Sequence, residues 1–293
     1  MKQAAIIGVG RVGGAFAIAL DRCGFVVSEL VTRDGSIPSI ADSLSHLPEV
    51  SGFGSSALIT AEIVILAVPD PSISLVMEAV RPRVAESAVV FHTSGSLASD
   101  VLIGKGQTAR NCGSLHPLIA ISDPIVGSTA FSGAYFCLEG GEEAVAIGRK
   151  LVASFGAHEL IVETNKKPLY HAAAVMSAGH VIALHAIAMR LFAHAGVEAS
   201  TGKEALLALS QSALRNLGTS SAEDALTGTF ARLDIETFRR HLESFDAYGD
   251  EDSREVYLDL GFASLGLVLE TPENFAAWQE FAQELNMAKA KGK

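Results

Sequence analysis

Three glycines near the start of the chain constrain its fold more than any other feature. Gly8, Gly10 and Gly13 have the spacing GxGxxG, directly after the apolar run at residues 4–7 and at the start of a helical pattern. In such a turn the first glycine bends the chain tightly, the second lets the backbone approach a pyrophosphate, and the third lets the helix pack on the strand. Glycine-rich turns are common, but the strand before this one and the helix after it favour dinucleotide binding. The residues predicted to hold the cofactor here are Gly8, Val9, Gly10, Arg11, Val12 and Gly13.

Short apolar runs and amphipathic stretches alternate after this turn. The sequence predicts strands at residues 4–7, 26–31, 63–68, 88–92, 135–138 and 160–162, with helices at 11–23, 72–80 and 142–155. Strands that are apolar on both faces are typical of a parallel sheet covered by helices. The alternation therefore predicts an α/β fold with a Rossmann-type, doubly wound parallel sheet.

Strand signals stop after residue 163, and the remaining patterns are helical. Pro168 opens a helical stretch that runs to about residue 195, a second stretch covers residues 203–217, and Thr271 has the position of an N-cap before Pro272. We therefore predict a dinucleotide-binding domain over residues 1–164 and an all-α domain for substrate binding and dimerisation over residues 165–293.

The long helical stretch is apolar nearly all round. One small domain cannot cover such a helix, so the sequence predicts a homodimer. The part at residues 172–189 contains Ser177, Gly179, His180 and His185. A helix packed between protein surfaces explains these residues better than a lipid span does, and we expect no membrane association.

The residues after the second predicted strand bear on the choice of cofactor. An acidic residue at this point binds the ribose hydroxyls of NAD, whereas an arginine accommodates the 2′-phosphate of NADP. The chain has Thr32 and Arg33, a hydroxyl and a guanidinium suited to a phosphate, followed by Asp34. We predict NADP over NAD. The alternative is that Arg33 is an ordinary surface residue and that Asp34 binds the ribose.

Two further strand ends are predicted to flank the nicotinamide. Val68 and Pro69 follow one apolar strand, and Thr93 follows another. Ligands in open α/β sheets bind at the carboxyl ends of strands. For any single residue the alternative is that it only ends a strand or turns the chain.

Composition excludes several classes of function. With 33 acidic and 22 basic residues the formal net charge is −11, which disfavours nucleic-acid binding. Three cysteines without CxxC spacing indicate reduced thiols, and with no targeting signal at either end we expect a cytoplasmic protein. No histidine pair has HExxH spacing, so no metal site is predicted.

Several segments together resemble a known family. They read GVGRVGGAFA, VTRD, AVPD, HTSGS, GSLHPL and YHAAAVMSAGHVIALH, followed by LTGTFARLD and FRRHL. They are similar to Rossmann-like proteins of the NADP oxidoreductase type with an uncharacterised helical C-terminal domain, in the broad group of 6-phosphogluconate dehydrogenase and pyrroline-carboxylate reductase. The resemblance covers nearly the whole chain and implies the fold and a nicotinamide cofactor, but no substrate. The chain departs from the family pattern at Gly179, Thr229 and Leu233.

A weaker resemblance concerns the catalytic residues. The HPL segment and the SAGH segment are similar to the His-Pro and Ser/His segments of prephenate dehydrogenases. This resemblance implies that His116 is the acid or base, Ser94 its hydrogen-bonding helper, and His180 a substrate contact. The alternatives are that His116 is a structural residue before Pro117 and that His180 packs in a core or an interface.

Helical geometry separates the histidines of the long helical stretch. At about 100° per residue His171 and His185 share a face, whereas His180 lies opposite His171. Ser177 and His180 share a face and could act together.

The sequence thus predicts an NADP-dependent oxidoreductase that transfers a hydride between nicotinamide and a small, anionic keto or imino compound. Histidine suits the accompanying proton near neutral pH. Arg110, Lys166 and Lys167 are candidate carboxylate contacts, and the favoured alternative for each is a solvated surface position. The alternative is a non-catalytic NADP-binding sensor or scaffold. A methyltransferase fits less well, because those enzymes want an acidic ribose ligand where Arg33 stands.

Overall fold

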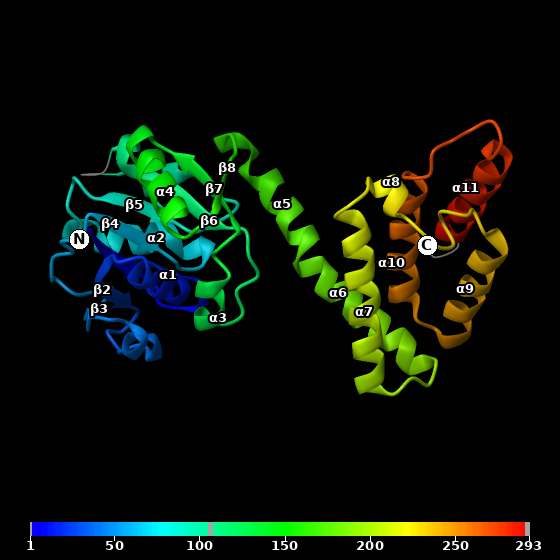
Figure 1. The fold of residues 1–293 in the computed structure, drawn as a ribbon, viewed down its shortest axis with the longest axis horizontal. Coiled ribbons are helices and arrows are strands. Elements are labelled where there is room, and N and C mark those ends of the chain that lie inside the picture. Colours follow the sequence, from blue (N-terminus) through cyan, green and yellow to red (C-terminus); the bar gives the residue numbers. More distant parts are fainter. Residues whose placement is uncertain (1, 105–107, 291–293) are drawn as a thin grey trace. The chain divides into compact units, whose positions relative to one another are not determined.

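The computed structural model describes residues 2–104 and 108–290. The chain divides into two compact units, Met1–His180 and Val181–Lys293. Each unit is described by itself below, and Figure 1 identifies their elements by label and colour.

The first unit is built on a sheet of eight strands in the order β3-β2-β1-β4-β5-β6-β7-β8. The strands are β1 (Gln3–Ile7), β2 (Val26–Thr32), β3 (Glu49–Gly52), β4 (Ile63–Leu66), β5 (Val89–His92), β6 (Cys112–Pro117), β7 (Tyr135–Gly140) and β8 (His158–Ile161). All neighbouring strands run parallel except β6 and β7. The predicted Rossmann-type fold is confirmed, with one antiparallel pair that the sequence did not indicate.

Two of these strands lack the apolar pattern on which the strand predictions depended. Strand β3 reads EVSG at the edge of the sheet, and β6 reads CGSLHP, with a glycine, a serine and a histidine inside it. Their neighbours hold them in the sheet, because pairing satisfies their backbone whatever their side chains are.

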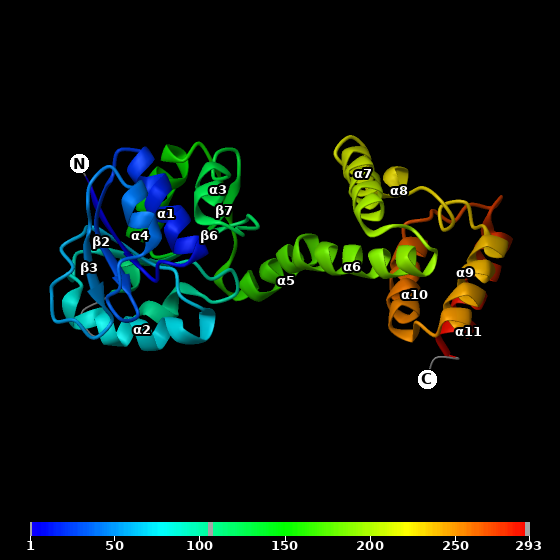
Figure 2. The same ribbon diagram turned by 90° about the horizontal axis from the view of Figure 1, so that it is seen from below.

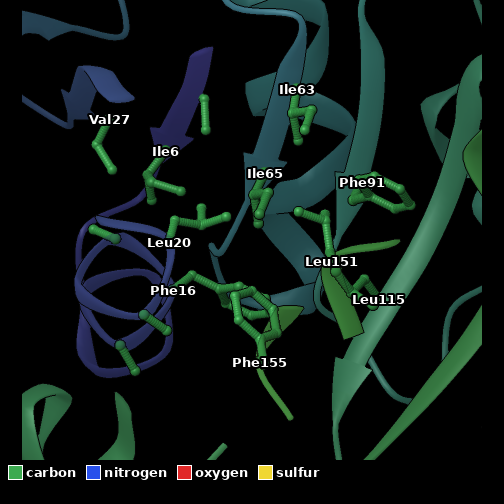
Figure 3. Packing of buried hydrophobic residues seen from close by; sticks show 14 of the residues in the cluster. Ile6, Phe16, Leu20, Val27, Ile63, Ile65, Phe91, Leu115, Leu151 and Phe155 are labelled. Carbon is green, nitrogen blue, oxygen red and sulfur yellow. The ribbon is translucent and has the colours of Figure 1, made fainter. Parts of the chain in front are cut away.

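Helices cover both faces of this sheet. They are α1 (Arg11–Arg22), α2 (Ile73–Val80), α3 (Pro124–Thr129) and α4 (Glu142–Ser154). Helix α5 (Lys167–Ser177) follows β8, and Lys167 is its only buried residue. Figure 2 shows α1, α3 and α4 on one side of the sheet and α2 on the other. The strands alternate accordingly: Ile6 packs with Phe16 on the α1 side, as Figure 3 shows, while Ile7 packs with Met77 on the α2 side.

The long predicted helix is interrupted. Helix α5 ends at Ser177, and Ala178 has φ −121° and ψ −69°, outside the helical region. A new helix, α6 (Gly179–His194), then begins. The sequence placed the domain boundary after residue 164, whereas the compact units divide after His180, because α5 packs on the ends of β5 and β6 through side chains described below.

Every element of the second unit in the described part of the chain is a helix. After α6 come α7 (Ala199–Leu217), α8 (Ala222–Ala225), α9 (Ile235–Tyr248), α10 (Glu251–Leu265) and α11 (Phe275–Ala290). The core is formed by Phe238, Leu258, Leu265, Phe281, Leu285 and Ala288. Asp234 and Asp250 cap the first turns of α9 and α10 by accepting from Thr237 N and Ser253 N.

By length and composition one helical stretch, Thr164–His194, could cross a membrane, with a mean hydropathy of 1.7 over a window that has no buried residue. A single such stretch is weak evidence, because helices that pack between protein surfaces have the same composition. The absence of membrane association stays a prediction.

Candidate functional site

The glycine turn between β1 and α1 has three different environments. Gly8 has φ +89°, and a Cβ atom there would lie 2.6 Å from Val68 Cγ1. At Gly13 a Cβ would lie 2.0 Å from the Gly8 carbonyl oxygen, whereas at Gly10 it would meet nothing within 4 Å. The chain's own packing therefore requires glycine at positions 8 and 13. At Gly10 the glycine leaves open space beside the first turn of α1.

A groove of about 560 Å³ opens at this turn. We call it the glycine groove. Among its lining residues are seven of the predicted cofactor residues, Gly8, Val9, Gly10, Thr32, Arg33, Val68 and Pro69, together with Asp34, Ser36 and Phe53. Its size is that of a small-molecule site.

The other predicted cofactor residues lie near the groove without lining it. Arg11 is exposed in the first turn of α1, Val12 packs against the core, and Gly13 is buried beneath the turn. Thr93 follows β5, and its backbone N–H donates to the Leu66 carbonyl oxygen at 3.1 Å.

A tight turn closes the far end of the groove. Ser36 donates to Asp34 Oδ1 through its backbone N–H at 3.1 Å and its hydroxyl at 2.7 Å, and Thr32 Oγ1 donates to the Ser36 carbonyl oxygen at 3.0 Å. The bonds from Ser36 lower the pKa of Asp34. Among residues 2–104 and 108–290 the exposed Arg33 guanidinium has no hydrogen-bond or ion-pair partner, so it is available to a ligand.

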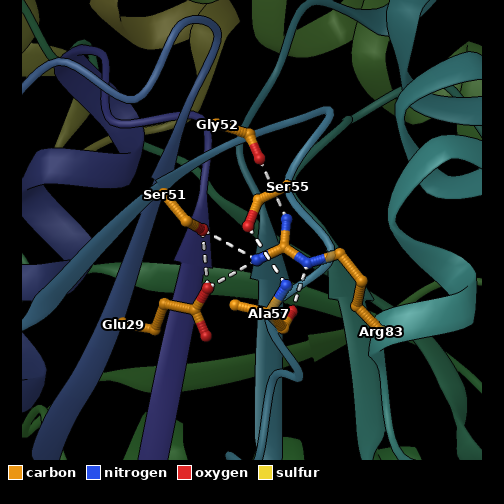
Figure 4. Close-up of polar contacts among 6 residues, drawn as sticks. All are labelled: Glu29, Ser51, Gly52, Ser55, Ala57 and Arg83. Atoms are coloured by element: carbon orange, nitrogen blue, oxygen red, sulfur yellow. Dashed lines mark hydrogen bonds and ion pairs between the residues drawn. The ribbon is translucent and has the colours of Figure 1, made fainter.

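A buried ion pair supports this end of the groove from below. Arg83 Nη2 donates to Glu29 Oε1 and to Ser51 Oγ, both at 2.7 Å, and the same guanidinium donates to the Gly52 and Ala57 carbonyl oxygens (Figure 4). The guanidinium therefore ties β2 and β3 to the loop that follows β3. That loop carries Phe53 into the groove.

Asp70 and Ser94 connect the ends of β4 and β5. Ser94 Oγ donates to Asp70 Oδ2 at 2.6 Å and accepts from the backbone N–H groups of Ser96 and Leu97. Ser96 Oγ also donates to Asp70 Oδ2, at 2.9 Å. The Ser94 hydroxyl is thus committed to its own turn and to Asp70, and the hydrogen bond from it to His116 that the resemblance implied is not formed.

Lys167 lies fully buried beneath this turn. Its Nζ donates to Ser114 Oγ at 2.6 Å and to the Ser94 carbonyl oxygen at 3.3 Å. Burial lowers the pKa of Lys167, and within the described residues it has no ion-pair partner. The expectation that Lys167 contacts a substrate carboxylate is wrong for this reason: the amine faces the protein interior.

His116 ends β6 and faces two residues of α5. Its Nδ1 lies 2.8 Å from the Tyr170 hydroxyl, and its ring lies 5.6 Å from the His171 ring at 86°. Burial lowers the pKa of His116 to about 4, so the imidazole is neutral near pH 7. Burial also raises the pKa of Tyr170, which keeps its hydroxyl protonated.

Gly95 brings the backbone against both imidazoles. A Cβ at this position would lie 2.9 Å from His116 Nε2 and 2.4 Å from His171 Nδ1. That His171 Nδ1 atom is buried and has no hydrogen-bond partner. Buried polar atoms nearly always have a partner, so this atom is a candidate ligand contact.

A second pocket, of about 480 Å³, opens beside these rings. We call it the histidine pocket. His116, Tyr170, His171 and Ser177 are its polar lining residues. The predicted His180 is exposed at the start of α6 and does not line it. His92 is a buried structural residue, because its Nε2 bonds the Ala98 carbonyl oxygen and its Nδ1 accepts from Ser94 N.

Direct contacts link the two pockets along one edge of the sheet. Gly8 packs against Val68 at the end of β4, Asp70 accepts from Ser94 at the end of β5, and Gly95 packs against His116 at the end of β6. The carboxyl ends of strands are where open α/β sheets bind ligands. This edge can therefore hold a dinucleotide and a second compound side by side.

The sequence interpretation missed Asp70, Tyr170 and His171 as site residues. Helical spacing offered a signal, because Lys167, Tyr170 and His171 are three and four residues apart and lie on one face of α5. Within residues 2–104 and 108–290 no group of three His, Cys, Asp or Glu side chains could hold a metal ion.

Comparison with family models divides the chain between residues 117 and 134, whereas the compact units divide after His180. Residues 2–117 match a Rossmann-like domain, and residues 134–263 match a domain of unknown function, DUF2520. No curated protein sequence matches the chain.

Solved structures share the fold over nearly the whole length. A protein of Thermotoga maritima is 18% identical with a TM-score of 0.66, and the match covers 98% of each chain. A provisionally named NADP oxidoreductase of Bacteroides fragilis is 17% identical with a TM-score of 0.67, over 99% of this chain and 98% of the other.

A third solved structure is the pyrroline carboxylate reductase of Plasmodium falciparum with NADP bound. It is 11% identical with a TM-score of 0.60, over 100% of this chain and 98% of the other. At such identities the likeness concerns the fold. The family resemblance inferred from the sequence is confirmed: the chain joins a region that matches the Rossmann-like domain to a region that matches the DUF2520 domain.

Proposed function

We propose that the protein is a nicotinamide-dependent oxidoreductase that prefers NADP and acts on a carbonyl or imino carbon. The main observation for this proposal is the open space at Gly10, beside the first turn of α1. Contacts between residues at the strand ends connect this part of the sheet edge to a pocket lined by two histidines. The fold shared with a reductase whose structure contains NADP supports it.

The glycine groove fits such a cofactor. The backbone at Gly8–Gly10 and the N-terminus of α1 would hold the pyrophosphate. Thr32, Arg33 and Ser36 would hold the 2′-phosphate, and Val68, Pro69 and Thr93 would flank the nicotinamide. When bound, the nicotinamide supplies or accepts the hydride.

His116 would handle the proton at the substrate. In the tautomer in which Nδ1 accepts from the Tyr170 hydroxyl, the ring carries its proton on Nε2, the atom beside Gly95. A neutral imidazole in this tautomer donates a hydrogen bond to the reacting oxygen or nitrogen and polarises it. Lys167 would act as a positioning residue, since it holds the Ser94 carbonyl oxygen from beneath.

Replacing Gly10 tests the cofactor site. Gly10→Ala adds a methyl group that meets no protein atom within 4 Å, so stability should hold while NADPH binding weakens by about tenfold or more. Gly54→Ala is the matched control, because a Cβ there also meets nothing within 4 Å and Gly54 does not line the groove. Fluorescence titration with NADPH measures the affinity of each variant. Equal NADPH affinity in the two variants would remove the proposed cofactor site.

A second candidate is a non-catalytic NADP-binding sensor or scaffold. Two observations favour it: the Ser94 hydroxyl is occupied by Asp70, and His180 lies outside the histidine pocket. Tight NADPH binding without oxidation by any carbonyl or imine, and without any response to the His116→Gln change, would favour this candidate.

We also propose that the protein is a cytoplasmic homodimer. Taken by itself, the second unit exposes Ile182 on α6 and Leu209, Leu214 and Leu217 on α7. Large apolar side chains exposed on two consecutive helices support a protein contact there. The three cysteines of the described residues are free, which suits a reducing compartment. Light scattering should give twice the chain mass, and Leu209→Glu should lower it. A monomeric wild type would refute the dimer.

A further inference from the structure

The histidine pocket has no charged side chain in its walls. Apart from the two histidines, Tyr170 and Ser177, its lining is apolar, and it includes Pro117, Leu118, Ile119, Leu160, Ala174 and Val175. No lysine, arginine, aspartate or glutamate of the described residues lines it. The pocket therefore offers hydrogen bonds and apolar surface, but no formal charge.

The three cations that the sequence offered as carboxylate contacts do not reach this pocket. Lys167 donates into the protein interior, to Ser114 and the Ser94 carbonyl oxygen. Lys166 pairs with Glu163 at 2.9 Å on the surface. Arg110 lies before the first residue of β6, whereas His116 lies at the other end of that strand, about 20 Å away at the usual rise per residue.

His116 does not supply the missing charge near neutral pH. Its pKa of about 4 results first from burial and then from the neighbouring His171 and Lys167; Asp70 opposes these effects only in part. A carboxylate brought into this pocket would lose its hydration without gaining a charged partner, which costs several kcal/mol.

Two ring nitrogens could form a hydrogen bond with a neutral polar group of a ligand. His116 Nε2 and His171 Nδ1 both lie against Gly95, and within the described residues His171 Nδ1 has no hydrogen-bond partner. The oxygen of a ketone, or the nitrogen of an imine, could accept from one of them while the rest of the compound fills the apolar part.

We propose that the substrate group bound in the histidine pocket is uncharged and largely apolar: a neutral ketone, aldehyde or imine with hydrocarbon substituents. This rests on the proposed oxidoreductase function, and it replaces the expected anionic substrate. In the reductive direction NADPH is oxidised: the carbonyl carbon gains a hydride and its oxygen gains one proton, so that a neutral alcohol forms.

Matched substrates test the proposal. The pair 4-methyl-2-pentanone and 4-methyl-2-oxopentanoate differ by a methyl group in place of a carboxylate, and so do phenylacetone and phenylpyruvate. With NADPH the wild type should have a kcat/KM at least about tenfold higher for each ketone than for its oxoacid, since that ratio corresponds to ~1.4 kcal/mol. A preference for the oxoacids would overturn the proposal.

An engineered charge provides the matched variants. Ala174→Arg places a guanidinium in the lining and should move the preference towards the oxoacid by about tenfold or more. Ala172→Arg makes the same change on the same helix at an exposed position outside the lining, and should not move it. Equal shifts in the two variants would mean that the effect is general electrostatics and would overturn the proposal.

Binding without turnover separates this inference from the proposed function. The ring Cε1–H resonances of His116 and His171 are followed by NMR during titration with 4-methyl-2-pentanone and then with 4-methyl-2-oxopentanoate. If the ketone shifts these resonances more strongly but is not reduced, the inference stands and the oxidoreductase proposal fails. If only the oxoacid is reduced, the oxidoreductase proposal stands and the inference of an uncharged substrate fails. If neither compound shifts them, as would happen with a pocket covered by protein, the inference fails.

Discussion

The chemistry of single residues in this protein is set by burial more than by residue type. Lys167 and His116 are ordinary bases in solution, yet burial lowers the pKa of both in the folded chain. The effect keeps His116 neutral near pH 7 and leaves Lys167 as an interior support for the Ser94 carbonyl oxygen.

Replacing His116 should separate catalysis from cofactor binding. His116→Gln keeps a hydrogen-bonding side chain but removes the imidazole, so turnover of a neutral ketone should fall by about 10² or more. NADPH affinity should hold, because His116 does not line the glycine groove. The control is His158→Gln, at an exposed position on β8. Unchanged turnover in His116→Gln would dismiss the role.

Stability should fall in acid because of two buried histidines. His92 and His116 have folded-state pKa values of about 4, below the ordinary 6.5. The unfolded chain therefore binds more protons between these values, so stability is full above pH 6.5 and decreases as the pH falls towards 4. From pH 7 to pH 5 each histidine should cost about 2 kcal/mol.

Urea unfolding at the two pH values measures this loss. His116→Gln should reduce the difference between pH 7 and pH 5 by about 2 kcal/mol, whereas the exposed His158→Gln should leave it unchanged. Equal pH dependence in the wild type and in His116→Gln would show that His116 titrates alike in both states.

At the scale of elements, loops and strand ends decide what the sheet can bind. The turn after β2 presents Arg33, which has no partner among residues 2–104 and 108–290, beside an Asp34 carboxylate that accepts two hydrogen bonds from Ser36. The Arg83–Glu29 pair supports the same region, since it joins β2 to β3 (Figure 4). The sheet positions these side chains at the end of the glycine groove.

Arg33 should determine the preference for NADP. Arg33→Gln removes the guanidinium, so the dissociation constant for NADPH should rise by about tenfold or more while that for NADH changes little. Titrations of the wild type and the variant with both cofactors measure this. If the wild type prefers NADH and Asp34→Asn weakens that binding, Asp34 is the ribose ligand instead.

The buried ion pair should be costly to break. Glu29→Gln leaves the Arg83 charge buried without a counterion, which should lower the free energy of unfolding by about 3 kcal/mol or more. Glu163→Gln breaks the exposed pair with Lys166 and should cost less than about 1 kcal/mol. Urea denaturation compares the two. Similar small losses would mean that water reaches Arg83.

At the scale of the whole molecule, the chain has two units with separate cores. Phe16 is central to the first unit and Phe281 to the second, and both side chains are fully buried. The single tryptophan of the chain, Trp278, packs on the second core. Its fluorescence therefore reports the unfolding of one unit only.

Core truncations should act on one unit each. Phe281→Ala should lower the midpoint of the Trp278 fluorescence transition, because removing a buried phenylalanine costs about 3–5 kcal/mol. Phe16→Ala should lower the midpoint of a transition seen by circular dichroism and leave the fluorescence midpoint in place. If either variant shifts both signals together, the two units unfold as one.

Local patterns were enough to predict the sheet and the glycine turn. The alternation of apolar runs with helical stretches predicted six of the strands, and the spacing of Gly8, Gly10 and Gly13 predicted where the groove lies. Strands β3 and β6 were not predicted, because pairing with their neighbours, and not an apolar pattern of their own, holds them in the sheet. Backbone turns and hydrophobic periodicity depend on residues that are close together in the chain, so they can be predicted from a single sequence.

The sequence by itself determined a Rossmann-type fold, the glycine turn and the Thr32–Arg33 strand end, because each depends on residues close together in the chain. Only the tertiary structure decided that Lys167 lies beneath Ser94, 73 residues away, and that His171 rather than His180 faces His116. It also decided that no lysine, arginine, aspartate or glutamate in the described part of the chain lines the histidine pocket. Such contacts depend on the order of the strands in the sheet and on how each helix is rotated about its axis, and neither can be predicted from a local sequence pattern.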